Sequence, residues 1–322
     1  MEQSNSLLPK IKQALWQFRT PVVLPCDLPY GLSPVSLLES ILDEEPRLQA
    51  YIKDIRMTAI PEGGYTYHVR YMNTQIPVAY VFLVESQDEL CRLMKDMAGK
   101  FVSDFVALVG DEVDPHASEE NFHHRDACRY PNLKATTLTT TKMQGRGQLV
   151  CTYAYTYRIP REILIERDKQ VERRIGEMVD ALTDKSASWR ENAYRIYDDL
   201  INHVTYAHDT PEGDVITQSV VQSAYGALIE GRCVCQGMAE AYARLLTRAG
   251  IPCRVIWGYT QDGTRHAWNV VEDPHGNRGH HDLTWAVMRP FEKDTYFHAN
   301  DQTMAESRTW DESLVERKNT DK

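Results

Sequence analysis

A cysteine lies where a helix is predicted to begin, and this position limits the folds and functions that the chain can have. Segment 224–242 reads Ala-Tyr-Gly-Ala-Leu-Ile-Glu-Gly-Arg-Cys-Val-Cys-Gln-Gly-Met-Ala-Glu-Ala-Tyr, a glycine-containing turn followed by a helix that starts near Cys235. Gly250 and Pro252 end this helix, because Gly is favoured just past a helix end and Pro cannot continue a helix. The apolar stripe of the helix consists of Ala239, Tyr242, Ala243 and Leu246.

A thiol at the start of a helix has chemical consequences. The unpaired backbone N–H groups and the positive end of the helix dipole favour thiolate over thiol. The same N–H groups can stabilise an oxyanion that forms on an attacked carbonyl. Small residues such as Gly237 and Ala239 let a substrate and neighbouring backbone approach closely. We therefore predict that Cys235 is a nucleophile.

Candidates for the base and its orienting acid follow the cysteine helix. Segments 253–258 and 266–271 are strand-like, and His266 opens the second of them. A turn at 273–277 leads to Asp282, which we predict to start a third strand. Adjacent antiparallel strands can bring His266 and Asp282 side by side, and the helix packed on that sheet would bring the thiol to the histidine. This is the arrangement that a thiol nucleophile needs.

Four motifs, taken in order, resemble the core of the transglutaminase-like superfamily. They are Ala-Leu-x-x-Gly-x-x-Val-Cys-Gln-Gly-x-Ala, Gly-Ile-Pro, His-Ala-Trp-Asn and Asp-Leu-Thr-Trp, and they cover about residues 188–285. The resemblance implies that Cys235 is the nucleophile, His266 the base and Asp282 the acid. It also implies an α+β fold with a papain-like core, in which the nucleophile helix packs against an antiparallel sheet. The first half of the chain is similar to the accessory region that precedes this core in some bacterial members.

Several neighbours of these motifs carry further predictions. The register Val-Cys-Gln-Gly selects the second cysteine of its stretch, so we expect Cys233 to be structural or a redox partner. Gln222 and Tyr225 are both candidates for an additional oxyanion donor, with a packing role as the alternative for each. Trp268 and Trp285 are candidates for the wall of the substrate pocket, with a place in the core as the alternative.

No metal or cofactor site is predicted. His280 and His281 flank Asp282, but adjacent strand residues point to opposite faces, whereas metal ligands must converge. The histidines at 123–124 and Cys128 form no ligand pattern either.

Length and patterning predict two domains and a tail. A chain of 322 residues accommodates about two domains of about 150 residues each. A short polar link at 184–188 separates an α+β N-terminal accessory domain, residues 1–185, from a catalytic domain at 186–310. A polar tail, residues 311–322, follows.

The first domain contains two segments that look alike, 35–107 and 125–183. Each has a Pro-x-Leu element, then a Tyr-rich strand with alternating pattern at 65–71 or 151–157, then a helix. One interpretation is an internal duplication. The other is that strand–helix units with tyrosine on one face are common in proteins, so the likeness needs no duplication.

Two capping boxes and one long apolar period predict helices. Ser86 and Ser188 each precede a Glu by three residues, a pattern typical of helix starts. We expect the first of these helices to carry Phe101 and Phe105 on its apolar face, and a further helix at about 162–182.

Charge and cysteine usage exclude several classes of protein. The formal net charge is −10 with no basic run, which argues against a nucleic-acid partner. The seven cysteines are odd in number and scattered, so a disulfide scaffold is disfavoured and a reducing compartment is expected. No stretch is apolar enough to cross a bilayer. The first residues lack a signal-peptide pattern, which predicts a cytoplasmic protein, although a trimmed leader would leave no trace. The sequence does not indicate an oligomeric state.

The predicted activity is cysteine-dependent acyl transfer on amide bonds of protein or peptide substrates, through a thioester. Water resolving the thioester gives a peptidase or amidase, and an amine resolving it gives a transglutaminase. We favour hydrolysis slightly, because water needs no second binding site. Peptide N-glycanases share this core, but paired Cys-x-x-Cys elements are missing from the sequence, as is an acidic calcium loop. The alternative is a non-catalytic interaction module with the same fold, against which the presence of all three triad residues argues.

Overall fold

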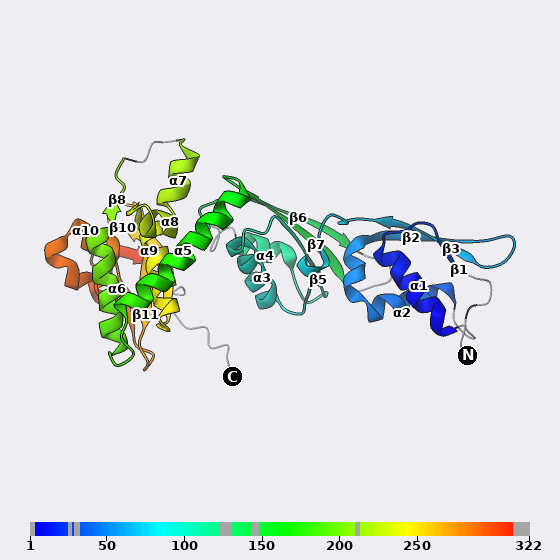
Figure 1. Cartoon of the computed structure of the whole chain (residues 1–322), viewed down its shortest axis with the longest axis horizontal. Coiled ribbons are helices and arrows are strands. Elements are labelled where there is room, and N and C mark those ends of the chain that lie inside the picture. The colour runs from blue at the N-terminus through cyan, green and yellow to red at the C-terminus, as the bar shows by residue number, and fades with distance from the viewer. Residues whose placement is uncertain are drawn as a thin grey trace. The chain divides into compact units, whose positions relative to one another are not determined.

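The computed structural model of the chain contains two compact units, Met1–Thr156 and Tyr157–Lys322 (Figure 1). The residues that it describes are 4–24, 28, 33–122, 130–142, 148–209 and 213–311. Helices and strands mix in both units, so the predicted α+β class is confirmed. Within the described residues, no helix is long and apolar enough to cross a membrane. The tail beyond Asp311, the histidines at 123–124 and Cys128 lie outside the described residues.

The first unit contains two sheets, each packed with helices. Its elements are α1 (Ser4–Trp16), β1 (Val22–Leu24), α2 (Pro34–Glu44), the 3₁₀ helix η1 (Pro46–Tyr51), β2 (Ile52–Ala59), β3 (Tyr65–Tyr71), η2 (Val78–Tyr80), β4 (Val81–Val84), α3 (Gln87–Gly99), β5 (Asp104–Val109), α4 (Pro115–Asn121), β6 (Leu133–Lys142) and β7 (Leu149–Tyr157). One sheet has the antiparallel order β1-β3-β2. The other has the order β4-β5-β7-β6, in which β5 is parallel to β4 and antiparallel to β7.

The start of α3 agrees with its capping box, but its end does not follow the apolar period. The Ser86 hydroxyl accepts a hydrogen bond from the backbone N–H of Glu89, as predicted. The helix then ends at Gly99, and Phe101 has a left-handed backbone with φ of 54°. Phe105 therefore lies on strand β5 rather than on the helix. The apolar period continues past the helix because a buried strand supplies the next apolar side chains.

The second unit consists of helices packed against a four-stranded antiparallel sheet. Its elements are α5 (Arg161–Leu182), α6 (Trp189–His203), β8 (Thr205–Tyr206), α7 (Val215–Val221), α8 (Ala224–Leu228), β9 (Arg232–Cys233), α9 (Cys235–Arg248), β10 (Cys253–Thr260), β11 (Arg265–Glu272), β12 (Arg278–His281), α10 (Leu283–Met288), η5 (Pro290–Tyr296), α11 (Asp301–Ala305) and β13 (Arg308–Trp310). The sheet has the order β12-β11-β10-β13. Helix α9 begins at Cys235 and packs on this sheet, so the predicted arrangement of the core is confirmed.

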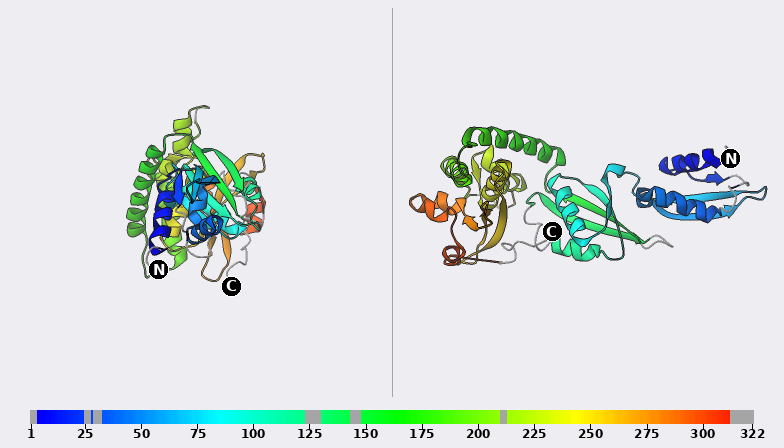
Figure 2. Two further views of the ribbon diagram at one scale, coloured as in Figure 1. Left: turned by 90° about the vertical axis from the view of Figure 1, so that its right-hand side faces the viewer. Right: turned by 90° about the horizontal axis from the view of Figure 1, so that it is seen from below.

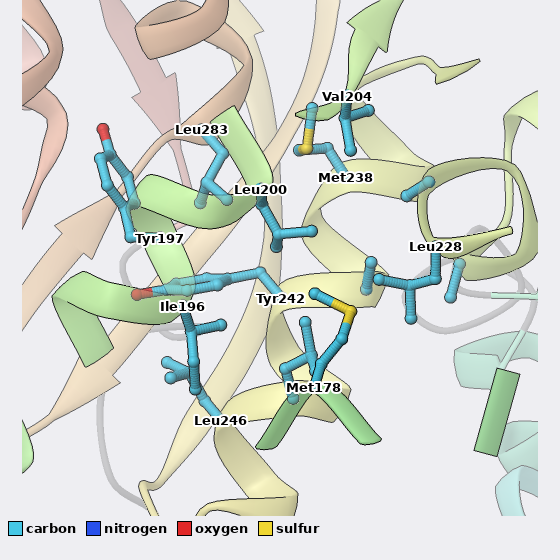
Figure 3. Close-up of a cluster of buried hydrophobic side chains, with 14 of the residues drawn as sticks. Met178, Ile196, Tyr197, Leu200, Val204, Leu228, Met238, Tyr242, Leu246 and Leu283 are labelled. Atoms are coloured by element: carbon cyan, nitrogen blue, oxygen red, sulfur yellow. The ribbon is translucent and has the colours of Figure 1, made fainter. Parts of the chain in front are cut away.

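A single apolar core holds α9 in place. Tyr242, Leu245 and Leu246 on α9 are fully buried among side chains from α5, α6 and α10. Figure 3 shows this packing, with Tyr242 and Leu246 of α9 near Ile196 of α6. In the right-hand view of Figure 2, α5 is the long green helix that lies beside the other helices of this unit. Burial of so many large side chains fixes the helix that carries Cys235, because a packed core resists small displacements.

The division of the chain differs from the predicted boundary near 184–188. Helix α5 belongs to the second unit, because Val171, Ile175 and Met178 are buried in the core that surrounds α9. The structure also does not show the internal duplication. Segment 35–107 contributes strands to both sheets of the first unit, whereas 125–183 supplies β6, β7 and α5.

Candidate active site

The position of Cys235 follows from a short parallel strand pair. Strand β9 pairs with β8, with Tyr206 opposite Cys233, and then leads into Val234 in an extended conformation. The backbone N–H of Val234 donates to the carbonyl of Val221 at 2.9 Å, and α9 starts at the next residue. Cys235 is partly exposed, whereas Cys233 is fully buried and burial raises the pKa of the Cys233 thiol. A buried neutral thiol fits the structural role predicted for Cys233.

Gly237 allows the chain before the helix to approach the first turn of α9. A Cβ atom at Gly237 would lie 2.7 Å from the carbonyl oxygens of both Val221 and Ser223. It would also lie 2.9 Å from Cβ of Cys233. The glycine is therefore required for close packing, and this packing places Gln222 beside the start of the nucleophile helix.

His266 lies between the thiol and a carboxylate. It stands on β11 opposite Gly258 of β10 and is 5% exposed. Its Nε2 lies 2.8 Å from Oδ2 of Asp282, and its side chain is also hydrogen-bonded to that of Cys235. Since Nε2 faces the carboxylate, Nδ1 is the ring nitrogen left for the thiol.

The electrostatics of this site favour a protonated histidine. Burial alone lowers the pKa of His266, but the Asp282 carboxylate and then the Cys235 thiol outweigh burial and raise the pKa to about 9. Burial also opposes the charged form of Asp282, yet His266 and Arg308 hold the pKa of this carboxyl below its usual value. The arrangement can thus accept a proton from the thiol and hold it on the ring.

Asp282 is fixed by a helix start and not by a strand. The predicted third strand, β12, ends at His281, and Asp282 is the N-cap of α10. Its Oδ1 accepts a hydrogen bond from the backbone N–H of Trp285 at 3.1 Å. The expectation that Asp282 starts a strand was therefore wrong. The carboxylate satisfies an unpaired N–H group of the helix with one oxygen and His266 with the other.

Arg308 is a partner of Asp282 that the sequence did not indicate. Its side chain is fully buried, and both Nε, at 3.0 Å, and Nη2 donate to Oδ2 of Asp282. The family motifs end near residue 285, and a lone arginine in the sequence gives no sign of burial. A charged residue between Ser307 and a strand-like Thr309-Trp310 pair was the only available signal.

Tyr206 is a second residue that sequence reasoning missed. Its hydroxyl is hydrogen-bonded to the backbone N–H of Cys235, and burial followed by the charge of the Cys235 thiolate raises the pKa of the phenol to about 12. A protonated phenol held at the start of α9 can donate to a nearby oxyanion. Tyr206 lies on the two-residue strand β8, which is too short for local periodicity to predict its contacts.

The two predicted oxyanion candidates differ in their surroundings. Gln222 follows α7 and is half-buried beside the first turn of α9. Tyr225 lies on α8, where its hydroxyl is hydrogen-bonded to the Glu230 side chain and its ring lies under the Arg167 guanidinium at 5.1 Å. The contacts of Tyr225 thus favour packing, and Gln222 is the better-placed candidate.

The two tryptophans contact residues of the His266–Asp282–Arg308 cluster, and their predicted place on a pocket wall stays a prediction. Trp268 is 1% exposed, and its ring stacks on that of His266 with centroids 5.7 Å apart. Its Nε1 donates to Nδ1 of His280 at 2.9 Å. Trp285 is half-buried, with the Arg308 guanidinium 3.8 Å from its ring centroid. Both tryptophans support charged or titratable groups of the site.

The histidines beside Asp282 point to separate partners. His280 lies between Trp268 and Asp301, with Nε2 of the histidine 2.8 Å from Oδ1 of Asp301. His281 contacts the Tyr242 hydroxyl at 2.9 Å through Nδ1. Within the described ranges, no group of three or more His, Cys, Asp or Glu side chains is arranged to hold a metal ion.

Comparisons with known proteins identify the fold of this unit. Residues 176–290 match the model of the transglutaminase-like superfamily, so the predicted resemblance is confirmed over that range. No curated protein matches the sequence. The matched range includes Cys235, His266 and Asp282 but not Arg308.

Three solved structures are similar at low identity. A crystal structure described as that of a TGase is 16% identical, with a TM-score of 0.31, and the match covers 71% of this chain and 64% of that chain. A "putative protease" from Parabacteroides distasonis is 14% identical, with a TM-score of 0.28 and coverages of 55% and 40%. A "putative cysteine protease" from Cytophaga hutchinsonii is 15% identical, with a TM-score of 0.28 and coverages of 47% and 65%. This chain spans less than two thirds of each, and likenesses this distant carry no argument about activity.

Proposed function

We propose that the transglutaminase-like domain around residues 176–290 catalyses cysteine-dependent acyl transfer on amide bonds of protein or peptide substrates. The observation that carries the proposal is the bridging position of His266, which is hydrogen-bonded to Cys235 on one side and to Asp282 on the other. In this proposal Cys235 is the nucleophile, His266 the base and Asp282 the group that orients the imidazole.

The first half of the reaction forms a thioester. His266 takes the thiol proton, and the sulfur of Cys235 attacks the amide carbonyl carbon while the carbonyl electron pair moves to oxygen. The Tyr206 hydroxyl, which accepts from the backbone N–H of Cys235, donates to this oxyanion. His266 then gives its proton to the amide nitrogen, the C–N bond breaks, and the amine leaves.

The second half of the reaction resolves the thioester. An incoming water or amine loses a proton to His266 and attacks the acyl carbon. The C–S bond then breaks, and His266 returns the proton to the Cys235 sulfur. Water yields a carboxylic acid and an amine yields a new amide. We favour water, because a second amine substrate needs a binding site of its own.

A pair of assays with matched variants tests this function. The protein is incubated with a glutamine-rich protein and a labelled primary amine, and released ammonia, new amino termini and incorporated label are measured. We expect new amino termini or ammonia without label, and we expect no product from Cys235→Ala. Cys233→Ala is the matched control, because that thiol is buried two residues away. Undiminished product from Cys235→Ala would refute the proposal, and label incorporation would assign the activity to amine transfer.

A non-catalytic interaction module remains the second candidate from the sequence. A module that only binds has no use for a buried histidine held between a thiol and a buried carboxylate, and such groups are costly to bury. The hydrogen-bonded geometry of the three residues therefore supports the catalytic alternative.

A further inference from the structure

The Arg308 side chain is fully buried. Among the described residues, its one ion-pair partner is Asp282. Its faces are covered by aromatic rings, with Trp285 at 3.8 Å and Tyr296 at 5.5 Å from the guanidinium carbon to the ring centroids. Nη1 donates to the Ser307 hydroxyl at 2.6 Å. A cation buried this completely is placed by the fold and is not a surface charge that happens to lie nearby.

Arg308 lies on strand β13, which forms one edge of the sheet. Arg308 pairs with Thr260 and Trp310 pairs with Gly258, so β13 lies beside β10. A Cβ atom at Gly258 would lie 2.1 Å from the carbonyl oxygen of Thr309 and 2.6 Å from the Trp268 ring. Gly258 therefore permits the approach of β13, and the backbone itself is arranged to bring Arg308 to Asp282.

The shared carboxylate oxygen lets Arg308 affect the charge balance of the His266–Asp282 pair. His266 and Arg308 both contact Oδ2 of Asp282. A buried carboxylate beside a neutral histidine would be uncompensated, so such a carboxylate would resist loss of the histidine proton. A guanidinium keeps its charge throughout the pH range of a folded protein. Arg308 therefore compensates Asp282 whether or not His266 is protonated.

The other titratable groups that face this carboxylate do not supply that compensation. Tyr197 and Tyr206 lie close to Asp282, and burial raises the pKa of both phenols, so both stay neutral. His280 also lies near, and burial lowers its pKa. Cys235 faces His266 and contributes a negative charge only as the thiolate. Among the described residues, Arg308 is thus the permanent positive charge at the His266–Asp282 pair.

We propose that Arg308 is a positioning residue of the thiol site, which neutralises the buried Asp282 carboxylate so that His266 can release its proton. The inference rests on the proposed function for its catalytic meaning. Without Arg308, the His266 imidazole holds its proton to higher pH, whether or not the site is catalytic.

The test is an NMR titration of His266 in the full chain, with the resonance assigned by its loss in His266→Ala. In Arg308→Met we expect the titration midpoint of His266 to rise by about one pH unit. The reason is that the variant loses a positive charge which shares the Asp282 carboxylate with the imidazolium and repels it. Arg308→Lys keeps the cation and should move the midpoint by less than about half as much. An unchanged or lowered midpoint in Arg308→Met would overturn the proposal.

A second pair of variants covers the case in which Arg308→Met fails to fold. Asp282→Asn with Arg308→Met removes both buried charges, and Asp282→Asn alone leaves the cation beside His266. The midpoint of His266 should be higher in the double variant than in Asp282→Asn, and equal midpoints would contradict the proposal. Because the titration needs no substrate, an inactive wild-type protein would refute the proposed function while the titration still decides the role of Arg308.

Discussion

Two histidines on the same sheet each face an aspartate, and the two pairs differ in the exposure of the carboxylate. In each pair a histidine Nε2 lies 2.8 Å from a carboxylate oxygen, and both histidines are buried. The Asp282 side chain, which faces His266, is 0% exposed, whereas the Asp301 side chain, which faces His280, is 74% exposed. The two pairs thus have the same nitrogen-to-oxygen distance, but one carboxylate is buried and the other is exposed to solvent.

The charges of the two histidines differ in consequence. For both rings burial opposes protonation, but the pKa of His266 is raised to about 9 and that of His280 is lowered. Solvent screens Asp301, whereas the low-dielectric surroundings of Asp282 strengthen its attraction for His266. The second nitrogen of His280 also accepts a hydrogen bond from Trp268, which requires that nitrogen to be unprotonated. Burial of the carboxylate, and not contact alone, therefore makes one pair fit for proton transfer.

The largest expected difference between the pairs is in catalysis. Asp282→Asn should lower kcat on a confirmed amide substrate by roughly 10³- to 10⁴-fold, because the imidazole loses its orienting anion. Asp301→Asn should change kcat by less than about 2-fold, since Asp301 lies outside the thiol site. Steady-state assays at a temperature where circular dichroism shows both variants folded make the comparison. Similar losses in both variants would remove the distinction between the pairs.

The next largest difference is expected in the unfolding free energies of the two aspartate variants. Asp282→Asn leaves the buried Arg308 without its anion, and breaking a buried ion pair costs about 3–5 kcal/mol of unfolding free energy. Asp301→Asn removes an exposed partner and should cost less than about 1 kcal/mol. Urea unfolding of both variants measures the difference. A cost for Asp301→Asn as large as that for Asp282→Asn would contradict a stabilising role of the buried Asp282–Arg308 ion pair.

The pH dependence of stability should have opposite sign for the two histidines. The raised pKa of His266 gives stability that is fully present below about pH 6.5 and is lost as pH rises through about 9, worth about 3 kcal/mol. The lowered pKa of His280 gives stability that is present above about pH 6.5 and is lost as pH falls below it. Urea unfolding of His266→Gln and His280→Gln across this range tests the signs. The same sign of the pH dependence for both histidines would contradict the opposite shifts of their pKa values.

The smallest effect is expected at the tryptophan between the two histidines. Trp268→Phe removes the donor to His280 and part of the stacked ring beside His266. We expect a loss of about 1–3 kcal/mol in unfolding free energy, from one buried hydrogen bond and a reduced ring. The pKa of His280 should also rise, because Nδ1 becomes free to take a proton. NMR titration of His280 with thermal unfolding measures both, and an unchanged His280 titration would count against the hydrogen bond as its cause.

Local patterns predicted the elements of the second unit well. The cap at Ser188, the long helix near 162–182 and the helix that starts at Cys235 all follow from capping residues and apolar periods. The domain boundary could not be predicted the same way, because the packing of α5 on α9 depends on contacts between distant residues. Phe101 shows the same limit, since an apolar period cannot reveal where a helix gives way to a strand.

The predicted triad residues came from short motifs, and the structure brings all three together. Their catalytic roles stay proposals. Arg308 and Tyr206 could not be predicted, because each reaches the site through strand pairing with a distant segment. A buried ion pair leaves no local trace in sequence, whereas a nucleophile at a helix start does. The supporting residues of this site are therefore visible only in three dimensions.

The rate at which iodoacetamide alkylates Cys235 measures how readily this thiol gives up its proton. The comparison thiols are Cys91 and Cys253, which are also partly exposed, and burial raises the pKa of Cys253 to about 12. Peptide mass spectrometry at pH 7 should show Cys235 reacting at least about 10-fold faster than either, because only Cys235 has a histidine to take its proton. His266→Ala should bring Cys235 down to the rate of Cys91. Equal rates for the three thiols in the wild-type protein would show that Cys235 is not an activated nucleophile.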